Sequence, residues 1–398
     1  MDMKQTKLRL GLAGGAALAV AAVLAGPAAA ANAATGANAA ASTGASTGAS
    51  ADSWRAGGAV FVQTDNTSGN AVVAYQRAAD GALTQAGVYS TGGIGGQLSG
   101  SVVDHLASQN SLVLDQATNT LYAVNAGSDT VSVFAVRGDR LQLIQTVGSG
   151  GTYPVSVAVR GNLVYVLNGL DGGSIQGFLS LGGRLLPIAA WHRALGLDPT
   201  ATPQFTNTPG QVAFTPDGSQ LLVTTKSNGN DVDVYSVQLD GSLSARPTVN
   251  SEPNDQPFSL TFDAAGHVML ILGGPGAVAS FNLSPSGHLT QLTSALTGAT
   301  ATCWIVRDGQ YFFASNAGSG TVSRFSESFS GGLTALGSTA TDAGTVDSAV
   351  SGDGRFLYVQ TGGAGIVDEF AVGHGGSLTE IGSVTVPGAV AGQGIAAS

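Results

Sequence analysis

Short runs of alternating apolar and polar residues recur from about residue 57 to the end of the chain. Examples are "LYAVN" at 121–125, "LVYVL" at 163–167 and "FLYVQ" at 356–360, each five residues long. Alternation with a period of two over this length is typical of β-strands. The pattern therefore predicts an all-β domain built from many short strands.

The predicted strands belong to a repeated unit. The segments "NAGSDTVSVFAV" at 125–136 and "NAGSGTVSRFSE" at 316–327 share eight of twelve residues. Each unit has an aromatic residue in its third run and a leucine soon after it, and successive leucines are 44 to 58 residues apart. The aromatic residues are Tyr75, Phe134, Phe178, Tyr235, Phe281, Phe325 and Phe370. Four strands per unit, repeated seven times, predict a seven-bladed β-propeller of antiparallel blades, with a solenoid as the alternative.

The turns and the chain ends support a closed ring. Asp-Gly pairs in "TPDGS" at 215–219 and "SGDGR" at 351–355 favour hairpin turns between first and second strands. The first unit lacks a first strand, whereas the tail "PGAVAGQGIAAS" at 387–398 follows the last complete unit. We expect this C-terminal strand to pair in the N-terminal blade, because ring closure removes exposed sheet edges.

The N-terminal region has a different character. Residues 1–30 combine a basic start, an apolar run and small residues, which is typical of a secretory signal peptide, with a membrane anchor as the alternative. Residues 31–52 are rich in Ala, Ser, Thr and Gly and predict a flexible tether. We expect a secreted, extracellular or envelope-associated protein without a membrane span after cleavage, with the propeller at 57–398.

Composition excludes several functions. The formal net charge is −10 and no Lys/Arg cluster occurs, so nucleic-acid binding is not expected. The single cysteine, Cys303, precludes an internal disulfide, and we interpret it as core packing. The segment "DNTSGN" at 65–70 lacks the closing Glu of a calcium loop. We therefore expect no metal and no cofactor.

Two insertions indicate where a site could lie. They span 89–109 and 189–210 and connect consecutive blades, so both are expected to lie on the same face of the ring. Long ordered loops on a rigid scaffold often bind ligands. The candidate acid–base residues on this face are His105, His192 and Asp347, and the candidate substrate-binding residues are Asp104, Arg193, Asp198 and Lys226. The alternative is that they are solvated loop residues or turn caps.

Several segments resemble a known family. "FTPDGSQLLVTT" at 214–225, "SGDGRFLYVQTGGAGIVDEFAV" at 351–372 and "LYAVNAGSDTVSVFAV" at 121–136 resemble secreted bacterial members of the seven-bladed lactonase family. That family includes bacterial phosphogluconolactonases and fungal carboxymuconate-lactonizing enzymes, and "LYAVN" is also similar to YVTN surface-layer repeats. Over residues 57–398, the resemblance implies a metal-free site at the pore mouth that opens or closes a lactone ring with His, Arg and acidic side chains.

The motifs that carry this activity differ in our chain. Where the family has a histidine before an innermost strand, the matching segments are Pro209-Gly210-Gln211 and Gln109-Asn110-Ser111. Thr225-Lys226 replaces an Asn-Glu pair, and Thr361-Gly362-Gly363 replaces Asn-Arg-Gly, while Asp347 keeps an acidic position.

Two main hypotheses follow. The first is a monomeric lactone-processing hydrolase or cycloisomerase, and the second is a non-catalytic envelope module that binds a glycan, peptide or protein on the same rim. A purely structural propeller is a third.

Overall fold

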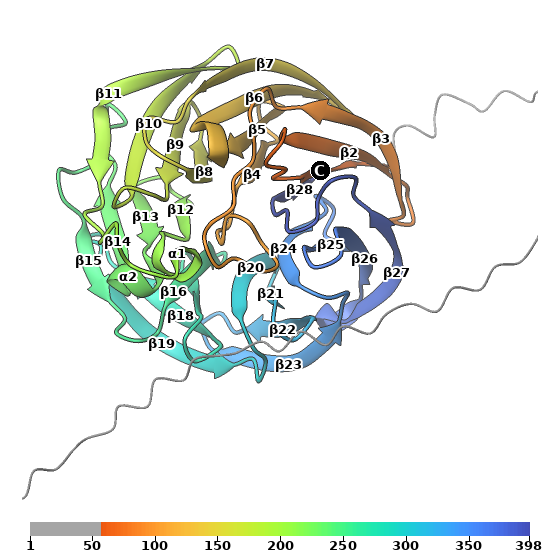
Figure 1. Cartoon of the computed structure of the whole chain (residues 1–398). Coiled ribbons are helices and arrows are strands. Elements are labelled where there is room, and N and C mark those ends of the chain that lie inside the picture. Colours follow the sequence, from red (N-terminus) through yellow and green to blue (C-terminus); the bar gives the residue numbers. More distant parts are fainter. Residues whose placement is uncertain (1–56) are drawn as a thin grey trace, which may run out of the picture. The chain divides into compact units, whose positions relative to one another are not determined.

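The computed structural model describes residues 57–398, so the predicted signal peptide and tether lie outside the described residues. The described chain forms seven four-stranded antiparallel sheets arranged in a ring (Figure 1). The sequence prediction of a seven-bladed β-propeller is confirmed. We number the blades 1 to 7 in chain order and give their strands from the axis outwards.

Blade 1 consists of β28 (Ile395–Ala397), β1 (Ala59–Gln63), β2 (Ala71–Arg77) and β3 (Leu83–Ser90). Blade 2 consists of β4 (Leu112–Asp115), β5 (Thr120–Asn125), β6 (Thr130–Arg137) and β7 (Arg140–Gly148). Blade 3 consists of β8 (Pro154–Arg160), β9 (Leu163–Asn168), β10 (Ser174–Leu181) and β11 (Arg184–Ala194). Blade 4 consists of β12 (Gln211–Phe214), β13 (Gln220–Thr224), β14 (Asp231–Ser236) and β15 (Thr248–Ser251).

Blade 5 consists of β16 (Pro257–Phe262), β17 (Val268–Leu272), β18 (Ala277–Leu283) and β19 (Leu289–Leu296). Blade 6 consists of β20 (Thr302–Asp308), β21 (Tyr311–Asn316), β22 (Thr321–Glu327) and β23 (Leu333–Ala340). Blade 7 consists of β24 (Thr345–Val350), β25 (Phe356–Thr361), β26 (Ile366–Val372) and β27 (Leu378–Thr385). Short helical turns are η2 (Ala126–Ser128), α1 (Gln204–Asn207), α2 (Lys226–Gly229) and η3 (His374–Gly376).

The C-terminal strand closes the ring as predicted. β28 pairs antiparallel with β1, with Ile395 opposite Val62 and Ala397 opposite Val60. β28 also lies against β24 of blade 7 and β4 of blade 2, so it completes the circle of innermost strands. Blade 1 therefore combines both ends of the described chain.

The repeated aromatic residues form the interior of the blades. All seven lie on the third strand of their blade, counted from the axis, and each is at most 2% exposed. They are Tyr75, Phe134, Phe178, Tyr235, Phe281, Phe325 and Phe370. In six blades the register of the outer strand pair shifts at or next to this residue. A β-bulge at this place bends the strand and increases its twist. The repeat thus encodes both the core and the shape of the blade.

The insertions have slightly different bounds from those expected. The first connects β3 to β4 and spans residues 91–111. The second spans residues 195–210, because residues 189–194 continue β11 as strand. Cys303 lies on β20 and packs against the main hydrophobic core, as predicted. None of the helices within residues 57–398 is long and apolar enough to cross a bilayer.

Candidate functional site

The first insertion folds inward across one end of the ring. In Figure 1 this segment lies over the middle of the blades. The side-chain amide of Gln109 donates to Ile305 O and accepts from Ile305 N, both at 2.9 Å, on β20 of blade 6. The carbonyl of Asn110 accepts from Val157 N on β8 of blade 3. The segment therefore connects distant blades and covers the axis.

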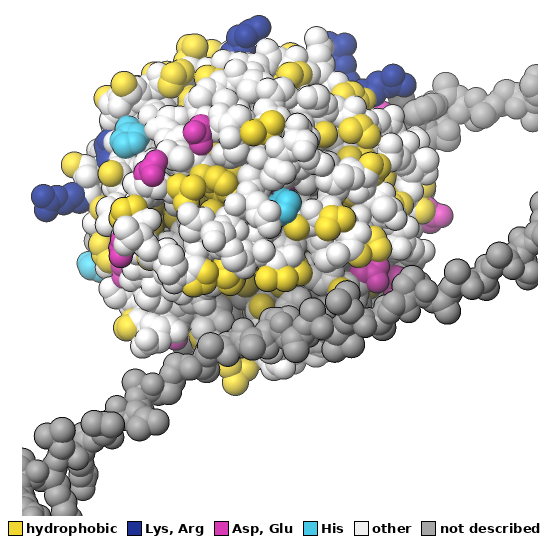
Figure 2. Space-filling view, viewed as in Figure 1, with side chains coloured by type: hydrophobic (Ala, Val, Ile, Leu, Met, Phe, Trp, Pro, Cys, Tyr) yellow, Lys and Arg dark blue, Asp and Glu magenta, His cyan; other side chains and the backbone are white. Residues whose placement is uncertain are grey.

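The space-filling view of the same face agrees with this arrangement. The middle is covered mainly by uncharged and hydrophobic side chains, with one histidine visible there, whereas the Lys and Arg side chains lie toward the edge (Figure 2). The insertion-bearing face is therefore largely closed over the axis.

Lys226 links the two insertions. Its side chain is fully buried, and Nζ donates to Ala107 O at 2.7 Å, Phe205 O at 2.7 Å and Thr208 Oγ1 at 3.1 Å. Burial lowers the pKa of Lys226 to about 7, although the charge of Asp104 opposes this shift. All three N–H donors of the ammonium form are thus directed at groups of the protein itself.

Two carboxyl groups are buried near the same face. Asp65 is 1% exposed and accepts from Gln393 N at 2.8 Å and from Gln63 Nε2. Asp347 is 4% exposed and accepts from Ser348 N at 2.9 Å. Burial raises the pKa of each to about 7. Burial therefore favours the protonated form of both carboxyl groups.

Asp104 and His105 join this group. Asp104 Oδ1 accepts from Ala107 N at 2.8 Å, and burial raises its pKa to about 6 against the charge of Lys226. His105 Nδ1 lies 3.2 Å from Asp65 O, and burial lowers the pKa of His105. We call Asp65, Asp104, His105, Lys226 and Asp347 the buried polar cluster, of which Asp104 and His105 are only partly buried. Asp65 was missed from the sequence, where it appeared only as part of a weak calcium-loop pattern.

The other three candidate residues lie elsewhere on the protein. His192 is exposed on β11, the outermost strand of blade 3. Arg193, on the same strand, donates through Nε to Ser244 O at 3.0 Å and also to Leu243 O in blade 4. Asp198 is exposed and accepts from Thr200 N at 2.8 Å. These contacts fix strand and turn geometry, and none is a hydrogen bond to the buried polar cluster.

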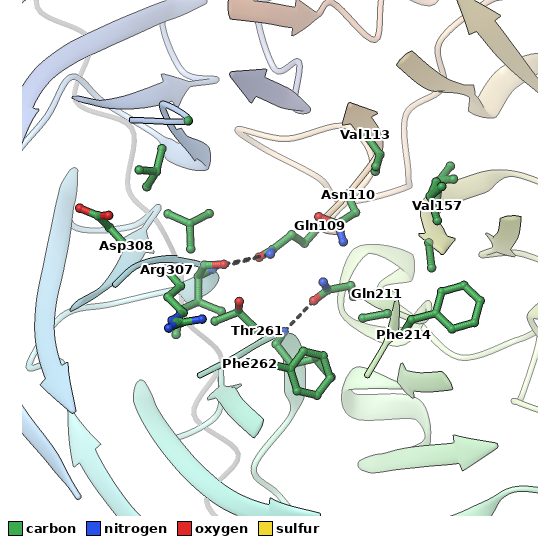
Figure 3. A pocket seen from close by; sticks show the side chains of 18 of the residues that line it. Gln109, Asn110, Val113, Val157, Gln211, Phe214, Thr261, Phe262, Arg307 and Asp308 are labelled. Atoms are coloured by element: carbon green, nitrogen blue, oxygen red, sulfur yellow. Dashed lines mark hydrogen bonds between the residues drawn. The ribbon is translucent and has the colours of Figure 1, made fainter. Parts of the chain in front are cut away.

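A cavity of about 710 Å³ lies along the axis on the opposite side of Gln109 (Figure 3). It is lined by the later parts of the innermost strands and by the turns that follow them. Gln211 closes its inner end beside Gln109 and accepts from Leu260 N at 2.6 Å. Since those strands run away from the insertions, the cavity opens on the face that carries the strand-to-strand turns. Sequence reasoning favoured the other face.

The cavity lining is polar but contains few charges. Arg307 and Asp308 lie at its side, from the end of β20, and Thr261 and Asn110 contribute a hydroxyl and an amide. The pKa of Asp308 is raised, because burial outweighs the opposing effect of the Arg307 charge. No histidine is among the described residues that line this cavity. Its groups can hydrogen-bond a ligand, but an imidazole base is not available there.

One group of metal-ligand side chains stands apart from the residues that line the cavity. It consists of Asp263, His267 and Glu327. His267 lies in a strand-to-strand turn but is largely covered. Its side chain is 18% exposed, and its Nδ1 lies 2.7 Å from Asp263 Oδ2.

The fold and the site together define a seven-bladed β-propeller with one end covered and an axial cavity at the other. Residues 54–173 match the family described as "Lactonase, 7-bladed beta-propeller". The predicted resemblance to the seven-bladed lactonase family is thereby confirmed. No curated protein matches the sequence.

Solved structures agree on the fold. A Bacteroides uniformis protein, provisionally described as a 6-phosphogluconolactonase, is 20% identical, with 86% of our chain and 99% of that chain covered and a TM-score of 0.70. A Bacteroides fragilis protein with the same provisional description is 22% identical, with 84% and 97% covered and a TM-score of 0.67. A periplasmic gluconolactonase of Pseudomonas aeruginosa is 21% identical, with 83% and 96% covered and a TM-score of 0.67.

Proposed function

We propose that this lactonase-family propeller binds a small, neutral, polyhydroxylated molecule, such as a sugar or a sugar lactone, in the axial cavity. The observation that supports this most strongly is the cavity itself, with a volume of about 710 Å³. Pockets for small molecules typically measure about 300–1,000 Å³ and orient the ligand with a few polar groups.

The lining favours a neutral ligand. Arg307 and Asp308 carry opposite charges, and the remaining polar groups are amides and hydroxyls. Because burying an uncompensated ion is costly, a balanced lining suits a ligand with hydroxyl groups better than a strongly charged one. Arg307 N–H groups can donate to a ring or carbonyl oxygen, and Asp308 can accept from hydroxyls. The gluconolactonase name of one similar structure supports a sugar lactone as the first ligand to test.

Calorimetric titration with glucono-δ-lactone, gluconate and glucose tests this proposal. The variant Thr261→Trp introduces a bulky ring into the cavity, and Thr334→Trp makes the same change at an exposed position on β23. We expect saturable binding in the wild type and in Thr334→Trp, and its loss in Thr261→Trp, with unchanged circular dichroism in both variants. Absence of binding by the wild type, or equal binding by both variants, contradicts the proposal.

Lactone hydrolysis in the buried polar cluster is the second candidate. It is favoured by the shifted pKa values of Asp65, Asp104 and Lys226, since such values concentrate at catalytic sites. A carboxylate there could deprotonate water for attack on a lactone carbonyl, and Lys226 could stabilise the resulting oxyanion. This requires residues 91–111 to move, because Lys226 donates to Ala107 in the closed arrangement.

A pH-stat assay with glucono-δ-lactone distinguishes the candidates. Hydrolysis predicts a rate above the spontaneous one that is lost in Asp104→Asn and retained in Thr261→Trp. Axial binding alone predicts only the spontaneous rate.

We further propose that the protein acts outside the cytoplasm, on the basis of residues 1–30, and sequencing the N-terminus of the exported protein would test this.

A further inference from the structure

Three side chains with metal-binding atoms meet at the boundary of blades 5 and 6. Asp263 and His267 come from the turn between β16 and β17, and Glu327 is the last residue of β22. His267 Nδ1 lies 2.7 Å from Asp263 Oδ2 and 3.7 Å from Glu327 Oε1. All three ligand atoms lie within 4.8 Å of one another. The Asp263 and Glu327 side chains are only 6% and 5% exposed.

Glu327 breaks the pattern of the repeat. It lies two residues after the repeated aromatic of its blade, a position that is apolar in four other blades: Val136, Val237, Leu283 and Val372. In blade 1 the equivalent residue is Arg77, which forms an ion pair of 3.2 Å with Asp353 in the first turn of blade 7. The boundary between blades 7 and 1 thus carries a pair of opposite charges. The corresponding boundary between blades 5 and 6 carries two carboxyl groups instead, from Asp263 and Glu327.

The cluster has an unfilled hydrogen-bonding site. Glu327 Oε1 is buried and has no hydrogen-bond partner. Burial and the nearby Asp263 raise the pKa of Glu327 to about 8. Although burial raises the pKa of Asp263, hydrogen bonds from His267 and from the Glu327 carboxyl group lower it overall. A buried acceptor without a partner is unusual in folded proteins and indicates a missing proton, water or cation.

We propose that Asp263, His267 and Glu327 form a binding site for a divalent transition metal, with Zn²⁺ as the best match, that joins blades 5 and 6. One imidazole nitrogen and two carboxylate oxygens are ordinary zinc ligands, at about 2.0–2.2 Å from the metal. Tetrahedral ligands at that radius are about 3.4 Å apart. The distance of 3.7 Å between His267 and Glu327 already suits this geometry, whereas the hydrogen bond of 2.7 Å to Asp263 must lengthen.

Metal binding replaces protons at the site. His267 Nδ1 must lose its proton to bind the metal, and Glu327 must be ionised, so binding releases protons and tightens as pH rises. Three protein ligands leave a fourth position for water. The three proposed ligands are not among the residues that line the proposed sugar site, although the charge of Arg307 in that lining also acts on Glu327.

The competing explanation is a proton shared between Asp263 and Glu327 in place of a metal. Titration of the EDTA-treated full-length protein with ZnCl2, followed by calorimetry and metal analysis after dialysis, separates the two. Glu327→Gln removes the ligand charge, Glu327→Val restores the apolar residue of the repeat, and His288→Ala removes an exposed histidine from another turn as the matched control.

We expect one Zn²⁺ per wild-type chain and per His288→Ala chain. Removing a direct ligand should weaken binding at least as much as removing a supporting group, so Glu327→Gln should lower the affinity about 100-fold. At 100 times the Kd, Zn²⁺ should raise the Tm of the wild type by about 3–5 °C and leave that of Glu327→Val unchanged. MgCl2 should have no effect, because Mg²⁺ disfavours imidazole.

Two results would overturn the proposal. One is wild-type protein that retains no zinc and shows no change in Tm, which would leave the shared proton as the explanation. The other is zinc binding of equal affinity in wild type and Glu327→Gln, which would indicate adventitious binding at other groups.

Discussion

Deleting residues 388–398 removes β28 and with it the innermost strand of blade 1. The deletion breaks the ladder to β1, including Gln63 N to Gly394 O at 2.8 Å and Ser398 N to Ala59 O at 2.9 Å. It also removes the hydrogen bond that Gln393 N donates to the buried carboxyl group of Asp65. The consequences thus reach both the ring closure and the buried polar cluster.

The size of this effect can be worked from the lost contacts. Ile395 is 5% exposed, and burial of such a side chain is worth about 2–3 kcal/mol. Backbone hydrogen bonds contribute about 1 kcal/mol each, and four of them join Ala391, Gly394 and Ser398 to the rest of the ring, so the loss with Ile395 is roughly 6–7 kcal/mol. Because domains are stable by only about 5–15 kcal/mol, a loss of this size removes roughly half of that stability or more, so the deletion should lower the Tm sharply.

A graded variant keeps the effect measurable. Ile395→Ala should lower the free energy of unfolding by about 3 kcal/mol, because it leaves a cavity between β28 and its neighbours. Leu239→Ala is the control, since Leu239 is fully exposed and its truncation should change stability by less than about 0.5 kcal/mol. Urea denaturation followed by circular dichroism measures both. A deletion variant with the wild-type midpoint would refute ring closure by β28.

Three further predictions concern the buried groups. Since Asp65 and Asp347 have folded pKa values of about 7, above their unfolded values, their contribution to stability is complete near pH 4 and is lost as pH rises to 7. The free energy of unfolding, measured by urea denaturation from pH 4 to 8, should therefore fall toward neutrality, and Asp347→Asn should reduce this slope by up to about 1.4 kcal/mol per pH unit. A free energy that does not change with pH contradicts the shifts. Lys226→Met should destabilise the protein by about 2–4 kcal/mol, because carbonyl groups of both insertions lose their hydrogen-bond donor. Limited proteolysis should then cut within 91–111 and 195–210. An unchanged cleavage pattern would contradict the claim that Lys226 holds the two insertions together. Gln109→Ala should lower the free energy of unfolding, measured by urea denaturation, by about 2 kcal/mol, because Ile305 N and O lose their hydrogen-bond partner. Hydrogen exchange checks the contact itself: an Ile305 N–H that still resists exchange in the variant would contradict it.

The scaffold was predictable because its signals are local and repeated. The aromatic of each third strand and the Asp-Gly turns recur at similar spacing, so seven weak signals support one another. The C-terminal strand could also be inferred, because blade 1 lacked an inner strand and the tail provided one. By contrast, the end of β11 was misjudged, since residues 189–194 alternate too weakly to be recognised as strand.

The site was less predictable because its contacts join residues far apart in the chain. Gln109 pairs with Ile305, 196 residues away, and Asp65 is held by Gln393, 328 residues away. Nothing near Asp65 in the sequence indicates that it is buried. Likewise, His267 reads as an ordinary turn residue until blade 6 brings Glu327 beside it. Only Glu327 itself carried a usable signal, as a charge at a mostly apolar position of the repeat.

The central claim is that the ligand site lies in the axial cavity, opposite the insertion-bearing face. A crystal structure of the protein soaked with glucono-δ-lactone tests it most directly. We predict electron density for the lactone or its hydrolysis product next to Thr261 and Arg307, with residues 91–111 in place. Density beneath residues 91–111, in contact with Lys226 and Asp104, would contradict the claim and favour hydrolysis in the buried polar cluster.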